Sequence, residues 1–416
     1  MRIKLKYISR INMGQSPEQE SVNQEGVGTP FLQGKAEFGE THPSPVNYCV
    51  KANKFSMPND ILMSVRAPVG SLNLSDQKYV IGRGLCSITP KDDVDRDYLW
   101  YGLIEANSRL LTLVKGSTFE AVTTEDVKNL EIKIPSNFEE QRIISKFLSK
   151  KDKKINDLII SKNKLIDLLE QQCQSIITEA VTKGLNPNVK MKDSGVEWIG
   201  EIPEHWGIKK IKNIANVYSS NVDKKSVEGE KEVLLCNYVD VYYNDSITAD
   251  KNFMKATAKD EQIKTFTLKK HDVIITKDSE SPKDIAIPTW VSEDLDGVVC
   301  GYHLSLIRCF ENTLGHYLYY TLESNQIKEQ FYTKANGVTR FGLSKEAIKN
   351  GLIAIPPFNE QLEIAEMLNN VNQEVRSTVE KLKIQIEKLK EYRQALIYEA
   401  VTGKIDVRDM ELDEVR

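Results

Sequence analysis

Apolar residues recur with heptad spacing in two stretches of the chain and predict two long amphipathic helices. Alternating steps of four and three residues connect a seam in each stretch. In the first stretch the seam positions are Ile155, Ile159, Lys162, Ile166, Leu169, Cys173, Ile176 and Ala180. Two hundred and twenty residues later they are Val375, Val379, Leu382, Ile386, Leu389, Arg393, Leu396 and Ala400. We expect helices of about 30 residues, about 45 Å long, that end at Gly184 and Gly403.

Each seam predicts a partner helix, because a single helix cannot bury it. The other copy is the natural partner, and antiparallel packing gives the pair a pseudo-twofold arrangement. In the symmetric register Ile155 faces Ala400 and Cys173 faces Leu382. Lys162 and Arg393 then share one layer, where two like charges are costly. A polar specificity layer, a shifted register and a gap where a partner docks each account for that layer.

The chain repeats itself with this same offset. Ile134–Gln141 recurs as Ile355–Gln361, with one residue inserted in the first copy, and Glu179–Thr182 recurs as Glu399–Thr402. Upstream the match is looser. The paired segments there are 60–62 with 272–274, 85–88 with 304–307, and 116–118 with 337–339. The pattern predicts a variable head followed by a conserved helix, twice over.

The heads read as mixed α/β. Short apolar runs such as 61–63, 79–81, 233–235 and 272–275 predict strands, whereas 98–114 and 314–331 predict helices. The fold class is therefore α+β: two pseudo-repeated mixed α/β domains joined by two long conserved helices in an antiparallel coiled coil. The expected segments are a first head (1–135), a helical region (136–184), a surface linker (185–206), a second head (207–355), a second helical region (356–404) and an acidic tail (405–416).

Composition narrows the classes. The 416 residues are 40% hydrophobic and 28% charged, which is typical of a folded globular protein. The formal net charge of −4 argues against coating nucleic acid by bulk charge. Six scattered cysteines without a C-x-x-C pair predict reduced thiols and a cytoplasmic protein. Without a run of about 18 apolar residues, we expect no membrane span.

Catalytic signatures are missing from the sequence. It contains no P-loop, dinucleotide-binding, zinc-protease or nucleophile-elbow motif, and no Asn-Pro-Pro-aromatic motif of an amino-methyltransferase. Glu131-Ile132-Lys133 resembles a fragment of a metal-dependent nuclease, but solvated strand charges explain it more simply. The five histidines are dispersed. We therefore expect no catalytic and no metal-ligating residues.

Basic and amide side chains near turns favour recognition of DNA, since Arg and Lys contact phosphates or guanine edges and Asn and Gln read adenine. The candidates in the first head are Gln33, Lys35, Arg66, Arg83, Lys115, Ser117 and Thr118. The candidates in the second head are Lys277, Lys283, His303, Lys334, Asn336, Thr339 and Arg340. The loops at 116–118 and 337–339 are the better candidates, because they occupy corresponding places in both heads.

These features resemble the specificity (S) subunit of Type I restriction–modification systems over essentially the whole chain. The resemblance rests on the Pro-x-x-x-Glu-Gln-type elements at 135–141 and 357–361, and on Glu179–Pro187. The segment Met191–Trp206 looks like the central linker of that family, and Met13–Pro17 also looks like family members.

The resemblance implies a non-catalytic subunit that gives the complex its DNA sequence specificity. Each head would be a target-recognition domain that reads one half of an asymmetric bipartite site in double-stranded DNA. The conserved helices would fix the spacing and dock two methyltransferase (M) subunits that methylate adenine with S-adenosylmethionine. Motor–nuclease (R) subunits would add ATP- and Mg²⁺-dependent cleavage for phage defence. No cofactor is expected on this chain itself.

Other readings remain open at this point. The chain could be an enzyme in its own right, a nuclease or a fused methyltransferase, although the missing motifs argue against this. It could be a coiled-coil scaffold whose heads bind proteins, or the recognition subunit of another restriction system with the same architecture. The target bases do not follow from the sequence, because recognition depends on loop geometry and DNA shape.

Overall fold

The computed structural model describes residues 2–114, 121–407 and 410. The chain divides into two compact units, which are described separately. The first unit comprises residues 1–163 and 383–416, and the second comprises residues 164–382. Each unit therefore contains one head, the start of the helix that follows this head, and the end of the other long helix.

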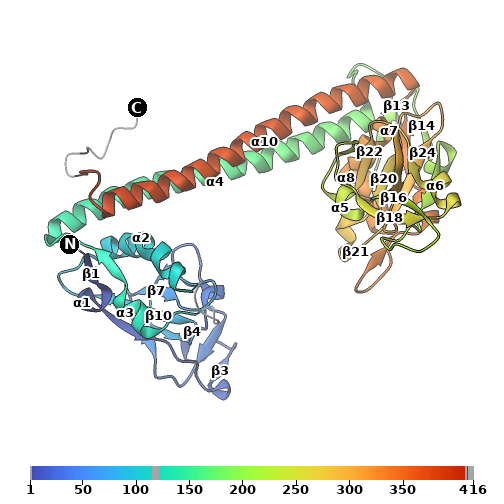
Figure 1. The fold of residues 1–416 in the computed structure, drawn as a ribbon. Coiled ribbons are helices and arrows are strands. Elements are labelled where there is room, and N and C mark those ends of the chain that lie inside the picture. Colours follow the sequence, from blue (N-terminus) through green and yellow to red (C-terminus); the bar gives the residue numbers. More distant parts are fainter. Residues whose placement is uncertain (1, 115–120, 408–409, 411–416) are drawn as a thin grey trace. The chain divides into compact units, whose positions relative to one another are not determined.

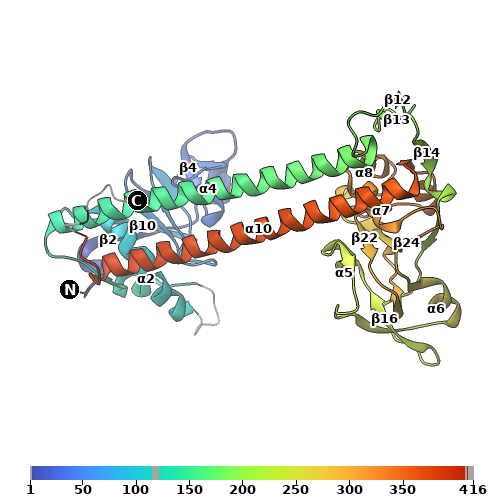
Figure 2. The same cartoon turned by 90° about the horizontal axis from the view of Figure 1, so that it is seen from above.

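The long helices are α4 (Phe138–Lys183) and α10 (Phe358–Val401), and they pack antiparallel (Figures 1 and 2). With 46 and 44 residues they are longer than the 30 or so expected from the heptads. The heptad pattern did not predict the first turns of the two helices, because these turns pack on a head instead of on the other helix. Phe147 of α4 belongs to the core of the first head, and Leu368 of α10 belongs to that of the second. Gly184 and Gly403 follow the helix ends with positive φ angles of 77° and 64°, which only glycine adopts at little cost.

The prediction of a symmetric register is wrong, because the two helices are shifted from it by about one heptad. Arg393 Nη1 lies 2.9 Å from Asn156 Oδ1 and 3.7 Å from Asp152 Oδ1, so Arg393 and not Ala400 reaches the level of Ile155. Lys162 Nζ donates to Gln385 Oε1 at 2.6 Å. Each seam charge thus has its own polar partner on the other helix. The shift avoids a layer with two like charges, as a shifted register would predict.

The first head is built from a ribbon, two sheets and short helices. The ribbon pairs β1 (Arg2–Lys4) with β11 (Glu131–Lys133). One sheet has the order β2 (Ser9–Met13), β10 (Leu85–Pro90), β7 (Ile61–Ser64), β8 (Leu72–Leu74). The other has the order β3 (Val22–Asn23), β5 (Asn47–Cys49), β4 (Thr29–Leu32), β9 (Tyr79–Ile81), β6 (Phe55–Ser56). The helices are α1 (Leu5–Ile8), α2 (Arg96–Val114) and α3 (Thr124–Asn129).

The second head repeats this plan. Its ribbon pairs β14 (Gly207–Lys210) with β26 (Leu352–Ile355). Its sheets have the orders β15 (Ala215–Ser219), β24 (Leu304–Cys309), β20 (Val273–Thr276), β22 (Pro288–Val291), β17 (Ser246–Ile247), and β18 (Met254–Ala258), β16 (Lys231–Cys236), β23 (Leu295–Cys300), β19 (Thr267–Leu268). A further pair joins β21 (Asp278–Ser279) to β25 (Phe341–Gly342). The helices are α5 (Tyr238–Tyr242), α6 (Asp260–Phe266), α7 (Gly315–Glu323), α8 (Asn325–Tyr332) and α9 (Lys345–Lys349).

Two local predictions need correction. The helix expected at 314–331 is broken at Ser324, whose backbone is extended and whose hydroxyl lies 3.1 Å from the Thr178 hydroxyl of α4. The segment 185–206 is not only a surface linker. It forms a hairpin of β12 (Met191–Asp193) and β13 (Glu201–Pro203), and Ile202 and Trp206 are 1% exposed within the core of the second unit.

A buried glutamine fixes each head to the start of its own helix. Gln141 accepts a hydrogen bond from the Asp95 amide and donates to the carbonyls of Asp93 and Pro135. Gln361 makes the equivalent set of bonds. It accepts from the Leu314 amide and donates to the carbonyls of Asn312 and Pro356. All of these side-chain hydrogen bonds therefore go to backbone atoms in both cases.

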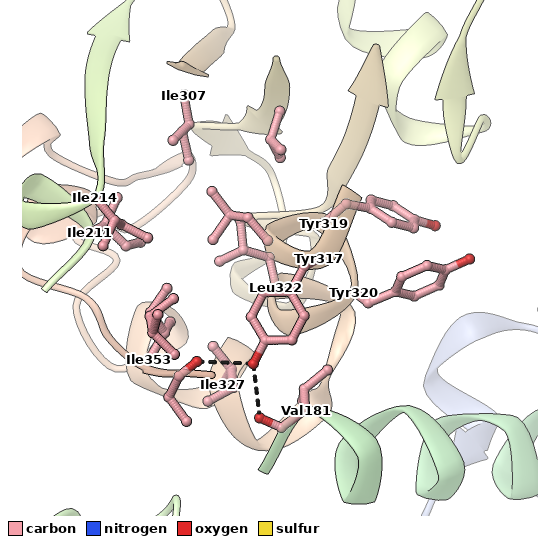
Figure 3. Packing of buried hydrophobic residues seen from close by; sticks show 14 of the residues in the cluster. Val181, Ile211, Ile214, Ile307, Tyr317, Tyr319, Tyr320, Leu322, Ile327 and Ile353 are labelled. Carbon is pink, nitrogen blue, oxygen red and sulfur yellow. Dashed lines mark hydrogen bonds between the residues drawn. The ribbon is translucent and has the colours of Figure 1, made fainter. Parts of the chain in front are cut away.

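A buried tyrosine fixes each head to the end of the other long helix. Tyr317 Oη donates to the carbonyls of Ala354 and of Val181, the latter at the end of α4 (Figure 3). Tyr98 Oη correspondingly lies 2.8 Å from the Lys133 carbonyl and 3.2 Å from the Val401 carbonyl at the end of α10. Each head is thus held by main-chain contacts at two helix ends.

Candidate nucleic-acid interface

In the first head, two parallel strands deliver loops to one edge of a sheet. β4 and β9 are parallel, with Leu32 opposite Ile81, so the segments after both strands emerge at the same edge. Gln33 follows β4, and Arg83 follows β9 one residue later. A network of backbone hydrogen bonds fixes these loops. It consists of the bonds Gly82 N to Leu32 O, Leu85 N to Gly82 O, Val65 N to Gly84 O, Val122 N to Val65 O, and Gly14 N to Leu85 O, all 2.8–3.0 Å long.

The second head contains a counterpart of each of these bonds. β16 and β23 are parallel, with Cys236 opposite Cys300. The corresponding bonds are Gly301 N to Cys236 O, Leu304 N to Gly301 O, Lys277 N to His303 O, Leu343 N to Lys277 O, and Ser220 N to Leu304 O, all 2.7–3.1 Å long. We call these two sets of hydrogen-bonded residues the loop frame of each head. Residues at or next to equivalent bonds correspond to one another in the two heads: Arg83 corresponds to Tyr302, Gly84 to His303, and Arg66 to Asp278.

The frame brings several predicted first-head residues together. Gln33, Arg66 and Arg83 are exposed on or beside it, and Lys35 is exposed two residues beyond Gln33. Among the described residues, the side chains of Arg66 and Arg83 have neither a hydrogen-bond nor an ion-pair partner. No described residue neutralises either charge. Lys115, Ser117 and Thr118 lie outside the described residues.

In the second head the frame brings Lys277, His303 and Arg340 together around Asp278. Arg340 Nη2 donates to Asp278 Oδ1 at 2.7 Å, and His303 Nδ1 lies 2.7 Å from the same oxygen. Lys277 Nζ donates to the Ser220 carbonyl at 2.8 Å and lies 4.5 Å from the centre of the Tyr302 ring. Burial lowers the pKa of the Lys277 ammonium, and the charge of Asp278 offsets part of this shift.

The remaining predicted residues are exposed and not part of this group of contacts. Lys283 follows Ser281, whose hydroxyl accepts from the Lys283 amide, and Lys334 lies in the turn after α8. Asn336 exchanges two backbone hydrogen bonds with Gly342 and so closes the loop that carries Thr339 and Arg340. Thr339 is exposed within this loop.

Sequence reasoning missed Asp278 and Tyr302. Each is adjacent to a predicted residue, Lys277 or His303. An acidic or an aromatic side chain was not predicted because only basic and amide groups were expected to contact DNA. The signal was available. Leu85 had been matched with Leu304, and the same offset places Arg83 opposite Tyr302; the match of Asp60 with Asp272 likewise places Arg66 opposite Asp278.

The apolar seam residues are buried or half-buried, and those near the helix ends pack into the cores of the heads. The buried ones are Ile155, Ile166, Val379, Leu382, Ile386 and Leu396. The half-buried ones are Ile159, Leu169, Ile176, Val375 and Leu389. Cys173 and Ala180 of α4 are buried as well, as is Ala400 of α10.

The nuclease-like fragment has a structural explanation. Ile132 is buried in the first head, and Lys133 Nζ donates to the carbonyl of Thr402 just after α10. Lysine near a helix C-terminus satisfies carbonyls that have no partner within the helix. Within residues 2–114, 121–407 and 410, no group of three or more His, Cys, Asp or Glu side chains is arranged to hold a metal ion. None of the helices in these ranges has both the length and the apolar character needed to cross a membrane.

Comparisons with known proteins agree with this architecture. Residues 1–170 and 203–388 match the family described as Type I restriction modification DNA specificity domain. The putative type I restriction enzyme MjaX specificity subunit of Methanocaldococcus jannaschii is 42% identical over 174 residues, which cover 42% of this chain and 40% of that relative. The MjaIX specificity subunit of the same organism is 28% identical over 358 residues, which cover 84% of this chain and 78% of that relative.

Solved structures share the fold. A chain from a study of complex assembly and conformational transition of the type I R-M system superposes with a TM-score of 0.74 at 15% identity, covering 97% of this chain and 98% of that chain. The HsdS subunit of Thermoanaerobacter tengcongensis gives a TM-score of 0.50 at 14% identity, covering 97% of each chain.

Two heads with different side chains, joined to an antiparallel pair of helices with a repeated sequence, match the class of DNA specificity proteins. The chain belongs to the family of Type I restriction–modification specificity (S) subunits, because the family match spans both heads and most of both helices. It is accordingly the DNA specificity subunit of such a system, a non-catalytic subunit.

Proposed function

We propose that each head reads one half of an asymmetric, bipartite DNA site. The observation that carries this proposal is the loop frame, which occurs once in each head with the same backbone bonds and with different side chains. Equivalent loops favour equivalent placement on DNA, whereas different side chains favour different bases. Two unlike half-sites give a target without palindromic symmetry.

The helix pair would set the spacing between the half-sites. A continuous helix of 46 residues is about 69 Å long. The proposal requires the helix pair to act as a stiff connector, in which each helix supports the other. Half-sites read from one side of a duplex must lie about one or two helical turns apart, and a stiff connector of fixed length selects one such spacing.

The outer faces of the helices would dock two methyltransferase subunits. Large apolar side chains are exposed on α4 outside the seam, with Leu158 50%, Ile160 55% and Leu168 51% exposed. Exposed apolar groups on a helix favour a protein partner. These partners would carry S-adenosylmethionine and transfer its methyl group to adenine, and motor–nuclease subunits would bring ATP and Mg²⁺. The assembled complex would act in the cytoplasm, where it meets phage DNA.

Sequencing the methylated bases of the host genome, with and without this gene, tests the proposal. We expect deletion to abolish methylation at one gapped, asymmetric adenine motif, and a plasmid copy to restore it. The matched experiment uses the purified chain together with its methyltransferase subunits and duplexes that carry the motif. An unchanged pattern of methylation in a host with active partner subunits would contradict the proposed role.

A further inference from the structure

The structure assigns Arg340 as a specificity-determining residue that recognises a guanine in the second half-site, with Asp278 as its positioning residue. The inference rests on the proposed function and deepens it. It starts from the way in which the second head holds this arginine. Arg340 directly precedes β25, which pairs with β21 such that Gly342 lies opposite Asp278. The base of the loop is closed by the two backbone bonds between Asn336 and Gly342.

The loop geometry depends on a glycine. Gly337 has a φ of +151°, and a Cβ atom there would approach the Arg340 carbonyl oxygen to 1.9 Å. A side chain at this position would therefore force the loop open. Such a tight, closed loop limits the positions from which the arginine side chain can start.

The guanidinium group is held at one end and free at the other. Nη2 donates to Asp278 Oδ1 at 2.7 Å, and the side chains of Arg340 and Asp278 are 57% and 18% exposed. Nη2 also lies 2.9 Å from Nδ1 of His303. Within the described part of the chain, Nε and Nη1 have no partner. A bidentate contact would pair Nε or Nη1 with the second hydrogen of Nη2, because only these pairs of N–H groups donate in parallel, and the carboxylate bound at Nη2 fixes the plane of the group in advance.

The neighbouring carboxylate decides between a base and a phosphate as ligand. A phosphate would be attracted by Arg340 but repelled by Asp278, which holds a negative charge in contact with the same guanidinium. A guanine edge is neutral and offers the N7 and O6 acceptors, the commonest specific partners of arginine in the major groove. The pair of Arg340 and Asp278 therefore suits a guanine better than the DNA backbone.

The first head has no carboxylate at the position that corresponds to Asp278. Arg66 stands where the second head has Asp278, so the frame position that supplies a carboxylate in one head supplies a cation in the other. This difference makes the device specific to the second half-site. Changes at Arg340 should leave recognition of the first half-site as it is.

The test uses the full chain assembled with its methyltransferase subunits. Methyl transfer is measured on duplexes that carry the genomic motif and on a panel in which each base pair of the second half-site is replaced in turn. We expect a G·C pair in this half-site at which R340A loses about tenfold to a hundredfold of discrimination. R340K should lose as much, because lysine cannot donate in bidentate fashion. D278N should lose part of it at the same base pair. The matched control K264A, which removes an exposed charge from α6, should leave discrimination unchanged.

Two results would overturn the inference. A second half-site without a G·C pair leaves Arg340 no guanine to read. Uniform weakening on all duplexes by R340A, rescued by R340K and accompanied by a salt dependence reduced by about one ion, would identify a phosphate contact. The proposed function fails separately, namely when the wild-type complex methylates without sequence preference. A methylation motif retained by the wild type and left unchanged by R340A and R340K refutes only the role of Arg340.

Discussion

The loop frame of the first head and that of the second differ in side chains while they agree in backbone bonds. Arg83 in one head is Tyr302 in the other, and Arg66 is Asp278. Gly84 of the first head approaches the Gln33 carbonyl so closely that a Cβ atom would lie 2.6 Å from the oxygen. The corresponding residue of the second head is His303, whose ring contacts Asp278. Main-chain bonds tolerate such exchanges because they do not depend on side-chain identity.

The buried glutamine and tyrosine that fix each head to the helices, which we call the clamps, are instead the same in both heads. Gln141 and Gln361 are identical residues with equivalent bonds, as are Tyr98 and Tyr317. All four side chains bind main-chain atoms of their surroundings. Hydrogen bonds to backbone atoms do not depend on the side chains of the head, so the head sequences can differ without loss of this attachment.

Exchange of residues 1–135 for the corresponding head of another family member should have the largest effect. We expect complete replacement of one half-site and an unchanged second half-site, because Gln141 would still find backbone partners in the new head. Sequencing of methylated bases in cells with the chimaera checks this. A change in both half-sites would show that the heads do not read independently.

Replacing Leu389 with Asp should break the helix pair. A carboxylate in the seam would lack a partner, at a cost of about 3 kcal/mol, and docking of the methyltransferase subunits should weaken with it. Leu169→Asp should have an equal effect if the two halves of the pair are equivalent. Light scattering of each variant mixed with the methyltransferase subunits measures complex assembly and tests both, with Lys388→Asp on the exposed face of α10 as control. Normal assembly of both seam variants would argue against the paired-helix role.

Replacing Gln361 with Leu should destabilise the second unit by about 3 kcal/mol, since a backbone amide and two carbonyls lose their buried partner. Gln141→Leu should destabilise the first unit by the same amount. Hydrogen exchange at each head, read with denaturant unfolding, locates and measures the loss. Gln171→Leu, on the exposed surface of α4, serves as control. Unequal losses would mean that the clamps are not equivalent.

Acidification should distinguish the units through His316. This histidine stacks on Trp290 with ring centres 3.9 Å apart, and burial, together with the charge of His271, lowers its pKa to about 4. The unfolded state binds the proton from about pH 6.5 downward, so stability is full above pH 6.5 and falls as the pH drops towards 4. The loss at pH 5 is about 2 kcal/mol.

The variant His316→Phe keeps the stack and should remove this loss from the second unit. The corresponding position of the first head is Asp97, which is half-exposed and paired with Arg96, so the first unit serves as internal control. Unfolding midpoints at pH 7.5 and pH 5 measure the difference. The same acid sensitivity in wild type and variant would exclude His316 as its source.

The smallest expected effect is on recognition in the first half-site. Arg83→Ala should cost about 1–2 kcal/mol of binding free energy for the complex on its duplex, because the exposed guanidinium has no partner within the described residues and is free for DNA. Tyr302→Ala should instead affect only the second half-site. Competition binding with duplexes altered in one half-site checks the assignment. Sensitivity of Arg83→Ala to changes in the second half-site would break the correspondence of the frames.

The sequence by itself determined the parts whose signals are local or strictly periodic. Heptad spacing predicted the two long helices and their seam, Gly184 and Gly403 marked their ends, and the offset of 220 residues, which is constant across the seams, revealed the repeat. Periodic burial needs no knowledge of distant residues, so it can be read from the order of residues alone.

Only the tertiary structure decided the register of the helices and the loop frames. Both seams allow several registers one heptad apart, and the partners of Arg393 and Lys162, which lie outside the seam, select among them. The frames were hidden because insertions change the offset along the chain, from 206 residues between Gly14 and Ser220 to 221 between Val122 and Leu343. Asp278, His303 and Arg340 meet through pairing of distant strands, and such long-range contacts leave no periodic trace in a sequence.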